Sequence, residues 1–159
     1  MQLGADIVIC SEGLSPEQLG NAIVEQAGKR PFAAIDCVAA DSTLALSLAV
    51  RDHGRILNFG LMSGLTVHNR ASLTLQCTLS GTAAIFRGVK FEGYWVSPYL
   101  LGMSLEERRA FFLEIFDLLG KKIIVPFTGE KFPFDKVKEA IVASNQPGRQ
   151  GKVMLVSEH

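Results

Sequence analysis

Three short apolar runs limit what this chain can fold into. They are residues 7–10 (IVIC), 32–38 (FAAIDCV) and 55–60 (RILNFG), and they recur at similar spacing. Apolar runs without polar alternation are typical of strands covered on both faces, as in a parallel sheet. Helical segments lie between the runs, and parallel strands are joined by right-handed crossovers. The pattern therefore predicts a β-α-β-α-β unit of the α/β class.

The two intervening segments carry start and stop signals of helices. In the first, Ser15 and Gln18 have the spacing of a capping box, and Gly28 would end the helix. In the second, Asp41 is the expected N-cap and Gly54 the expected stop. Each helix would thus begin and end on residues of its own segment.

The second half of the chain has a different pattern. A fourth strand is predicted at residues 90–97 (KFEGYWVS), and Ser104 with Glu107 forms the capping box of an amphipathic helix. That helix would bury a stripe made of Phe111, Ile115, Leu118 and Leu119. The tail predicts a strand, a short helix and a final strand at residues 123–132, 134–144 and 151–157.

Composition excludes several classes of partner. The 16 basic residues balance the 16 acidic ones, so the net charge gives no reason to expect a nucleic-acid or membrane partner.

The cysteines and the lack of long apolar runs bear on the compartment. Cys10, Cys37 and Cys77 are isolated in sequence and form no pair with zinc-site spacing, so we expect small buried side chains in a reducing compartment. No run approaches the roughly twenty apolar residues of a membrane span, and no targeting segment leads the chain, so the residues alone predict a soluble cytoplasmic protein.

The glycine pattern leaves function open. A β-α-β-α-β chain with a glycine at the end of a strand suggests dinucleotide binding, but the phosphate turn G-x-G-x-x-G is absent. Gly60 and Gly64 are four positions apart, and no Walker loop is present. From the residues alone, a nucleotide-binding domain and a purely structural α/β domain remain alternatives.

The order of longer motifs carries a resemblance. The steps LGAD-x-VI, AIDCVA, GRILNFG-x-M, GYWVS, F-x-x-V-x-x-A and GKVML resemble the C-terminal part of the medium-chain dehydrogenase/reductase superfamily. The nearest likeness is to the mitochondrial trans-2-enoyl-CoA and enoyl-acyl-carrier-protein reductases. The resemblance implies an incomplete Rossmann-like parallel sheet, strands 3 to 6 of an NADP-binding domain, in residues 1–122. It implies a return segment of the GroES-like catalytic domain in residues 123–159.

The resemblance also implies which residues would bind the cofactor, NADPH. They are Cys37, Val38 and Ala39 along the cofactor; Phe59, Gly60, Leu61 and Met62 at the nicotinamide-ribose end; Tyr94, Trp95 and Val96 at the carboxamide; and Lys152 on the closing strand. Glycine would let the backbone approach the ligand, whereas Leu61 stands where the family often has a second glycine. Without the resemblance, Tyr94 and Trp95 would be packing residues and Lys152 a solvated charge.

The family's reaction would need residues that this chain lacks. Proteins of this family pass hydride from NADPH to the β-carbon of a 2-enoyl thioester in fatty acid synthesis, while a tyrosine of the N-terminal domain helps to protonate the α-carbon. The tyrosine and the glycine-rich turn would precede Leu3, so we expect the C-terminal portion of a mitochondrial reductase, inactive alone, with no catalytic residue or metal ligand. The alternatives are a quinone-oxidoreductase-like member and a non-catalytic binding or assembly module.

Missing strands would also affect assembly. In a sheet of order 3-2-1-4-5-6, strands 1 and 2 are central, so residues 7–10 and 32–38 would each have an unpaired edge. Unpaired apolar edges favour association between chains. We therefore expect a homo-oligomer with a four-stranded or rearranged parallel core.

Overall fold

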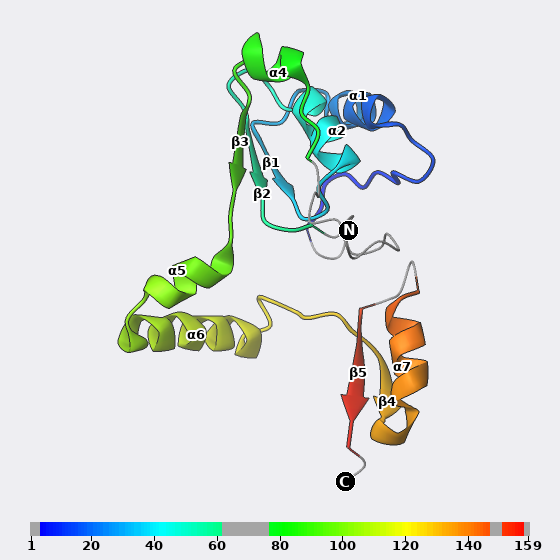
Figure 1. The fold of residues 1–159 in the computed structure, drawn as a ribbon, viewed down its shortest axis with the longest axis vertical. Coiled ribbons are helices and arrows are strands. Elements are labelled where there is room, and N and C mark those ends of the chain that lie inside the picture. The colour runs from blue at the N-terminus through cyan, green and yellow to red at the C-terminus, as the bar shows by residue number, and fades with distance from the viewer. Residues whose placement is uncertain (1–3, 62–76, 147–150, 158–159) are drawn as a thin grey trace. The chain divides into compact units, whose positions relative to one another are not determined.

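The structure, a computed structural model, describes residues 4–61, 77–146 and 151–157 (Figure 1). By its internal contacts the chain divides into two compact units, Met1–Leu100 and Leu101–His159. Among the described residues, no helix combines the length and the apolar composition needed to cross a membrane.

The first unit contains a three-stranded parallel sheet. Its strands are β1 (Ala33–Asp36), β2 (Arg55–Asn58) and β3 (Lys90–Gly93), paired in the order β1-β2-β3. Helices α2 (Asp41–Ala49) and α4 (Gly81–Ile85) lie in the two crossovers, as expected for parallel strands. The small parallel sheet confirms the predicted class, an incomplete Rossmann-like α/β fold.

One face of this sheet is packed and the other is open. Ile56 of β2 is fully buried and α2 contacts both β1 and β2, while α1 (Pro16–Ala27) lies beside α2 (Figure 1). A Cβ at Gly20 would lie 2.9 Å from the carbonyl oxygen of Ala45, so the two helices approach closely. On the opposite face Ile35 is 70% exposed, because strand side chains alternate between faces.

The predicted strand at residues 7–10 is wrong. These residues have no strand structure, Val8 is 66% exposed and Cys10, predicted to be buried, is exposed. A strand requires a hydrogen-bonded neighbour, and β1 pairs only with β2 among the described residues. The fourth predicted strand, residues 90–97, is also shorter than expected, since β3 ends at Gly93 and helix α5 (Val96–Gly102) begins three residues later.

Helix α1 follows its sequence signals and α2 does not. The Ser15–Gln18 capping box starts α1, and Gly28 ends it in the left-handed conformation. Asp41 is the first helical residue of α2 and not its N-cap, which is Ala40. The expected stop at Gly54 is wrong as well, because α2 ends at Ala49.

Arginine side chains bind backbone carbonyls at the C-terminal end of α2. The guanidinium of Arg87 donates to the carbonyl oxygens of Leu48, at 3.3 Å, and of Val50. Arg30 also donates to Leu48. These donors satisfy carbonyls that the end of a helix leaves without an intrahelical partner, so no glycine cap is needed.

The second unit contains α6 (Leu105–Gly120) and a β-α-β segment. Ser104 and Glu107 form the predicted capping box of α6, whose predicted stripe is half-buried, not buried. The segment consists of β4 (Thr128–Pro133), the 3-10 turn η1 (Phe134–Lys136), α7 (Val137–Ser144) and β5 (Lys152–Val156). The two strands pair in parallel and α7 lies beside them (Figure 1). The order strand, helix, strand is as predicted, but β4 begins at Thr128 and not at residue 123.

Candidate functional site

Three loops meet at the carboxyl ends of β1, β2 and β3. The hydrogen bonds of the sheet continue into these loops, because the amide of Phe59 donates to the carbonyl of Asp36 at 3.0 Å and that of Tyr94 to Asn58 at 2.7 Å. In open α/β sheets, ligands bind outside the carboxyl ends of the strands. The region at the carboxyl ends of these strands is therefore the candidate site of the first unit.

Gly60 allows the loops after β1 and β2 to touch. A Cβ at this position would lie 2.6 Å from the carbonyl oxygen of Cys37 and 3.1 Å from its Cα, and both are backbone atoms. The carbonyl of Gly60 accepts a hydrogen bond of 3.2 Å from the side-chain amide of Asn58, which is 9% exposed. The position therefore requires glycine, and a buried side chain fixes the loop.

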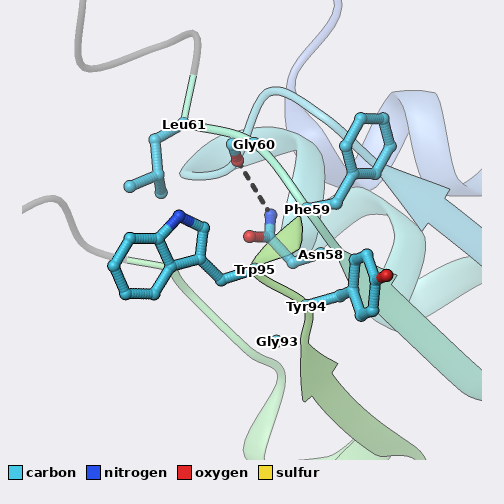
Figure 2. Close-up of a pocket in the computed structure, with 7 residues that line it drawn as sticks. All are labelled: Asn58, Phe59, Gly60, Leu61, Gly93, Tyr94 and Trp95. Atoms are coloured by element: carbon cyan, nitrogen blue, oxygen red, sulfur yellow. Dashed lines mark hydrogen bonds between the residues drawn. The ribbon is translucent and has the colours of Figure 1, made fainter. Parts of the chain in front are cut away.

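A pocket of about 530 Å³ opens at the carboxyl ends of β2 and β3 (Figure 2). Its lining residues are Asn58, Phe59, Gly60, Leu61, Gly93, Tyr94 and Trp95. In Figure 2, Trp95 and Leu61 lie on one side of Asn58, and the rings of Phe59 and Tyr94 lie on the other. Trp95 is 73% exposed, so its indole ring is accessible to a planar ligand.

A second pocket, of about 490 Å³, shares the rings of Phe59, Tyr94 and Trp95 with the first. Its other lining residues are Ile35, Leu57 and Val96. Since Ile35 and Leu57 are paired in register, this pocket extends from the strand ends onto the open face of the sheet. The aromatic rings are thus common to two largely apolar pockets, of which the first also contains the amide side chain of Asn58.

The loop after β1 is built around Asp36. This side chain is 2% exposed, and its carboxylate accepts hydrogen bonds from the amides of Val38 and Ala39 and the hydroxyls of Ser42 and Thr43. Burial acts to raise the pKa of Asp36. The hydrogen bonds, above all that from Thr43, favour the ionised form and hold the pKa below its ordinary value. Asp36 is therefore an ionised turn-former.

Five of the residues that the resemblance implies line the first pocket: Phe59, Gly60, Leu61, Tyr94 and Trp95. Val96 lines the second pocket, and Cys37, Val38 and Ala39 lie in the loop that touches Gly60 without lining either pocket. Lys152 is the first residue of β5, in the second unit, and Met62 lies outside the described residues.

Sequence reasoning missed several residues of the site. Asn58 and Gly93 line the first pocket, and Ile35 and Leu57 line the second. A signal for Asn58 was present, because it is a polar residue that closes the apolar run RIL before a glycine turn. No comparable signal marks Ile35 and Leu57, which look like ordinary strand residues.

The sequence matches proteins of known activity. A family model described as zinc-binding dehydrogenase matches residues 3–155. The mitochondrial enoyl-[acyl-carrier-protein] reductase of Dictyostelium discoideum is 27% identical over 154 residues, 97% of this chain and 40% of that relative. The Homo sapiens enzyme of the same name is 24% identical, over 96% of this chain and 38% of its own length. The chain thus spans about 40% of the length of these curated relatives.

Solved structures share the fold. A putative NADPH:quinone reductase from Bacillus thuringiensis has a TM-score of 0.74 at 19% identity, over 99% of this chain and 44% of that one. The mitochondrial 2-enoyl thioester reductase heterodimer from Candida tropicalis has a TM-score of 0.58 at 18% identity, over 82% and 35%. At these identities the likeness is one of fold alone.

The description of the family mentions zinc, and the residues described here do not fit that metal. Across residues 4–61, 77–146 and 151–157, no group of three or more His, Cys, Asp or Glu side chains is arranged to hold a metal ion. The match to the family model nevertheless extends over nearly the whole chain, and the sheet has the expected parallel topology. The chain therefore belongs to the zinc-binding dehydrogenase family of the medium-chain dehydrogenase/reductase superfamily.

Proposed function

We propose that this chain is the C-terminal portion of an NADPH-dependent 2-enoyl thioester reductase and carries part of its cofactor site. The observation that carries the proposal is the aromatic pocket at the carboxyl ends of β2 and β3, next to a backbone contact at Gly60 that only glycine permits. The two relatives named as enoyl-[acyl-carrier-protein] reductases support the substrate class. By itself the chain has little or no activity.

In this proposal the residues divide by what they do for the cofactor. The residues along the cofactor are Cys37, Val38 and Ala39, and those at the nicotinamide ribose are Phe59, Gly60, Leu61 and Met62. Backbone groups for the carboxamide come from Tyr94, Trp95 and Val96. The family resemblance also implies Lys152 as a cofactor residue. Gly60 lets the loop after β2 pack against the backbone of Cys37, because a Cβ there would clash with that backbone. The pocket that this loop lines would hold the ligand. NADPH supplies the hydride, and these residues bind and orient it.

Two features of the pocket bear on specificity. Leu61 narrows the pocket where we expect the family to have a second glycine, so the ligand has less room on the Trp95 side. The phenol of Tyr94 belongs to the binding wall and is not the proton donor. Residues 1–122 then belong to the NADP-binding domain, and residues 123–159 are the return segment of the catalytic domain.

Assembly and location follow from the same proposal. Within the described part of the chain, β1 and β3 each pair with β2 alone, so each has one edge without a partner strand. We propose a homo-oligomer joined through these edges. A mitochondrial location and a role in fatty acid synthesis rest on the names of the relatives.

Fluorescence of Trp95, the single tryptophan of the chain, offers a direct test. We expect saturable quenching when NADPH is added, and no turnover of crotonyl-CoA. Absence of saturable binding would contradict the cofactor site and would favour an assembly module. Turnover of crotonyl-CoA would contradict the proposal that the chain is inactive alone. Turnover of quinones without that of crotonyl-CoA would favour the quinone-oxidoreductase alternative.

A further inference from the structure

The carboxylate of Asp36 is buried and is fully occupied within its own turn. One oxygen, Oδ1, accepts from the amides of Val38 at 2.9 Å and Ala39 at 3.0 Å and from the Ser42 hydroxyl at 2.7 Å. The other, Oδ2, accepts from the Thr43 hydroxyl at 2.6 Å. With these four donors the carboxylate needs no ligand to satisfy it.

The turn that Asp36 holds has an unusual backbone. Ala39 and Ala40 have φ values of 69° and 55°, a region that residues with a Cβ rarely adopt. The Ser42 hydroxyl lies 2.9 Å from the carbonyl oxygen of Ala39, and Ala40 forms a parallel bridge with Cys77. The turn therefore keeps a costly conformation because its surroundings enforce it.

The position of this turn suggests why the cost is retained. It lies at the carboxyl end of β1, and Cys37 is in contact with Gly60 of the neighbouring loop. A helix can start with an ordinary backbone when its N-cap is Ser or Asp, as α1 does. Strained backbone is concentrated at binding sites, where it fixes the direction of peptide groups.

We propose that Asp36 is a positioning residue, which holds the turn of Cys37, Val38 and Ala39 against Gly60 and so fixes the loop that lines the pocket for the nicotinamide nucleotide. The carboxylate acts through the turn and does not touch the ligand. The inference takes its ligand from the proposed function. Its mechanism, the locking of the turn, rests only on the contacts described above.

The first experiment needs no ligand. Hydrogen exchange of the Val38 and Ala39 amides is measured by NMR in the wild type, Asp36→Ala, Asp36→Asn and the control Asp41→Asn, an exposed carboxylate of the same turn. We expect exchange at least about tenfold faster in Asp36→Ala, because the charged acceptor is lost. Asp36→Asn retains Oδ1 and should remain within about threefold of the wild type. Unchanged exchange in folded Asp36→Ala would overturn the proposal.

The second experiment measures the dissociation constant of NADPH from Trp95 fluorescence, at a temperature where circular dichroism shows every variant folded. We expect weakening by about tenfold in Asp36→Ala, recovery to within about threefold in Asp36→Asn and no change in Asp41→Asn. A loss of stability alone would not change affinity at such a temperature. Equal affinity in folded Asp36→Ala would overturn the proposal.

The two experiments separate the possible failures. If the wild type does not bind NADPH, the proposed function fails, and the role of Asp36 in binding is overturned with it, whatever the exchange shows. If Asp36→Ala does not fold, Ser42→Ala takes its place, because it removes one donor to the same oxygen. We then expect a smaller change in the same direction in both measurements, and no change in either would overturn the proposal.

Discussion

Helices α1 and α2 begin in different ways. The start of α1 is set by residues close to one another in the sequence, and that of α2 makes contact with another element of the fold. The start of α1 is fixed by Ser15 and Gln18, three positions apart on an exposed surface. At the start of α2, the hydroxyls of Ser42 and Thr43 donate to the carboxylate of Asp36, which lies on the preceding strand. A local cap can be found by scanning the sequence, whereas hydrogen bonds between a helix and a preceding strand depend on the fold.

The largest expected effect on stability comes from removing the Asp36 carboxylate, which accepts hydrogen bonds from the start of α2. Asp36→Ala should lower the free energy of unfolding by about 3 kcal/mol, because a charged acceptor is lost and its buried donors remain. Urea unfolding followed by circular dichroism measures it. A loss of less than about 1 kcal/mol, the value typical of an exposed cap, would remove the distinction between the two helices.

The next largest effect is expected at the contact between the loops after β1 and β2, where Gly60 meets Cys37. Gly60→Ala would place a Cβ against the backbone of Cys37, and forced overpacking costs about 1–3 kcal/mol. Gly81→Ala is the matched control, because no atom lies within 4 Å of a Cβ there. Thermal unfolding should show a clear destabilisation only for Gly60→Ala. Equal midpoints for the two variants would show that the loops do not meet as described.

A smaller effect is expected at the local cap. Ser15→Ala should cost about 1 kcal/mol, because the amide of Gln18 loses its acceptor. Chemical denaturation measures this loss, and Ser15→Asp, which retains a capping oxygen, serves as the control. If the loss equalled that of Asp36→Ala, the comparison between α1 and α2 would fail.

The smallest effect concerns pH. Because the pKa of Asp36 is lowered in the folded state, its charge contributes stability that is fully present above the unfolded value of about 3.9 and is lost as pH falls through the folded value. Unfolding free energies from pH 7 down to 2 should therefore fall more steeply in the wild type than in Asp36→Asn. Parallel curves would contradict the lowered pKa.

The same comparison explains what the sequence predicts and what it does not. Residues 32–38 and 55–60 were recognisable because apolar runs between helices favour parallel strands, and the box at Ser104 was recognisable because its partners are three positions apart. Residues 7–10 have a similar apolar pattern but pair with no strand in the described part of the chain. The error arose because a strand depends on its partner as much as on its own residues.

Some features of the candidate site are predictable from the sequence, and others depend on the fold. Gly60 and the aromatic pair Tyr94 and Trp95 are suggested by motif resemblance, and five implied residues line one pocket. The positive φ angles at Ala39 and Ala40 have no sequence signal, since alanine is not a residue typical of that conformation. The tertiary contacts of the turn account for them, including the hydrogen bonds of Asp36 and the bridge between Ala40 and Cys77.

The sequential order of the sheet has a consequence for synthesis on the ribosome. Strands β1, β2 and β3 are neighbours in the sheet in the order in which they occur along the chain. Within this sheet, β2 and β3 therefore each find the neighbouring strand already made when they leave the exit tunnel. The nascent first unit can pair these three strands from the N-terminal side onward, and β3 is the last of them to appear.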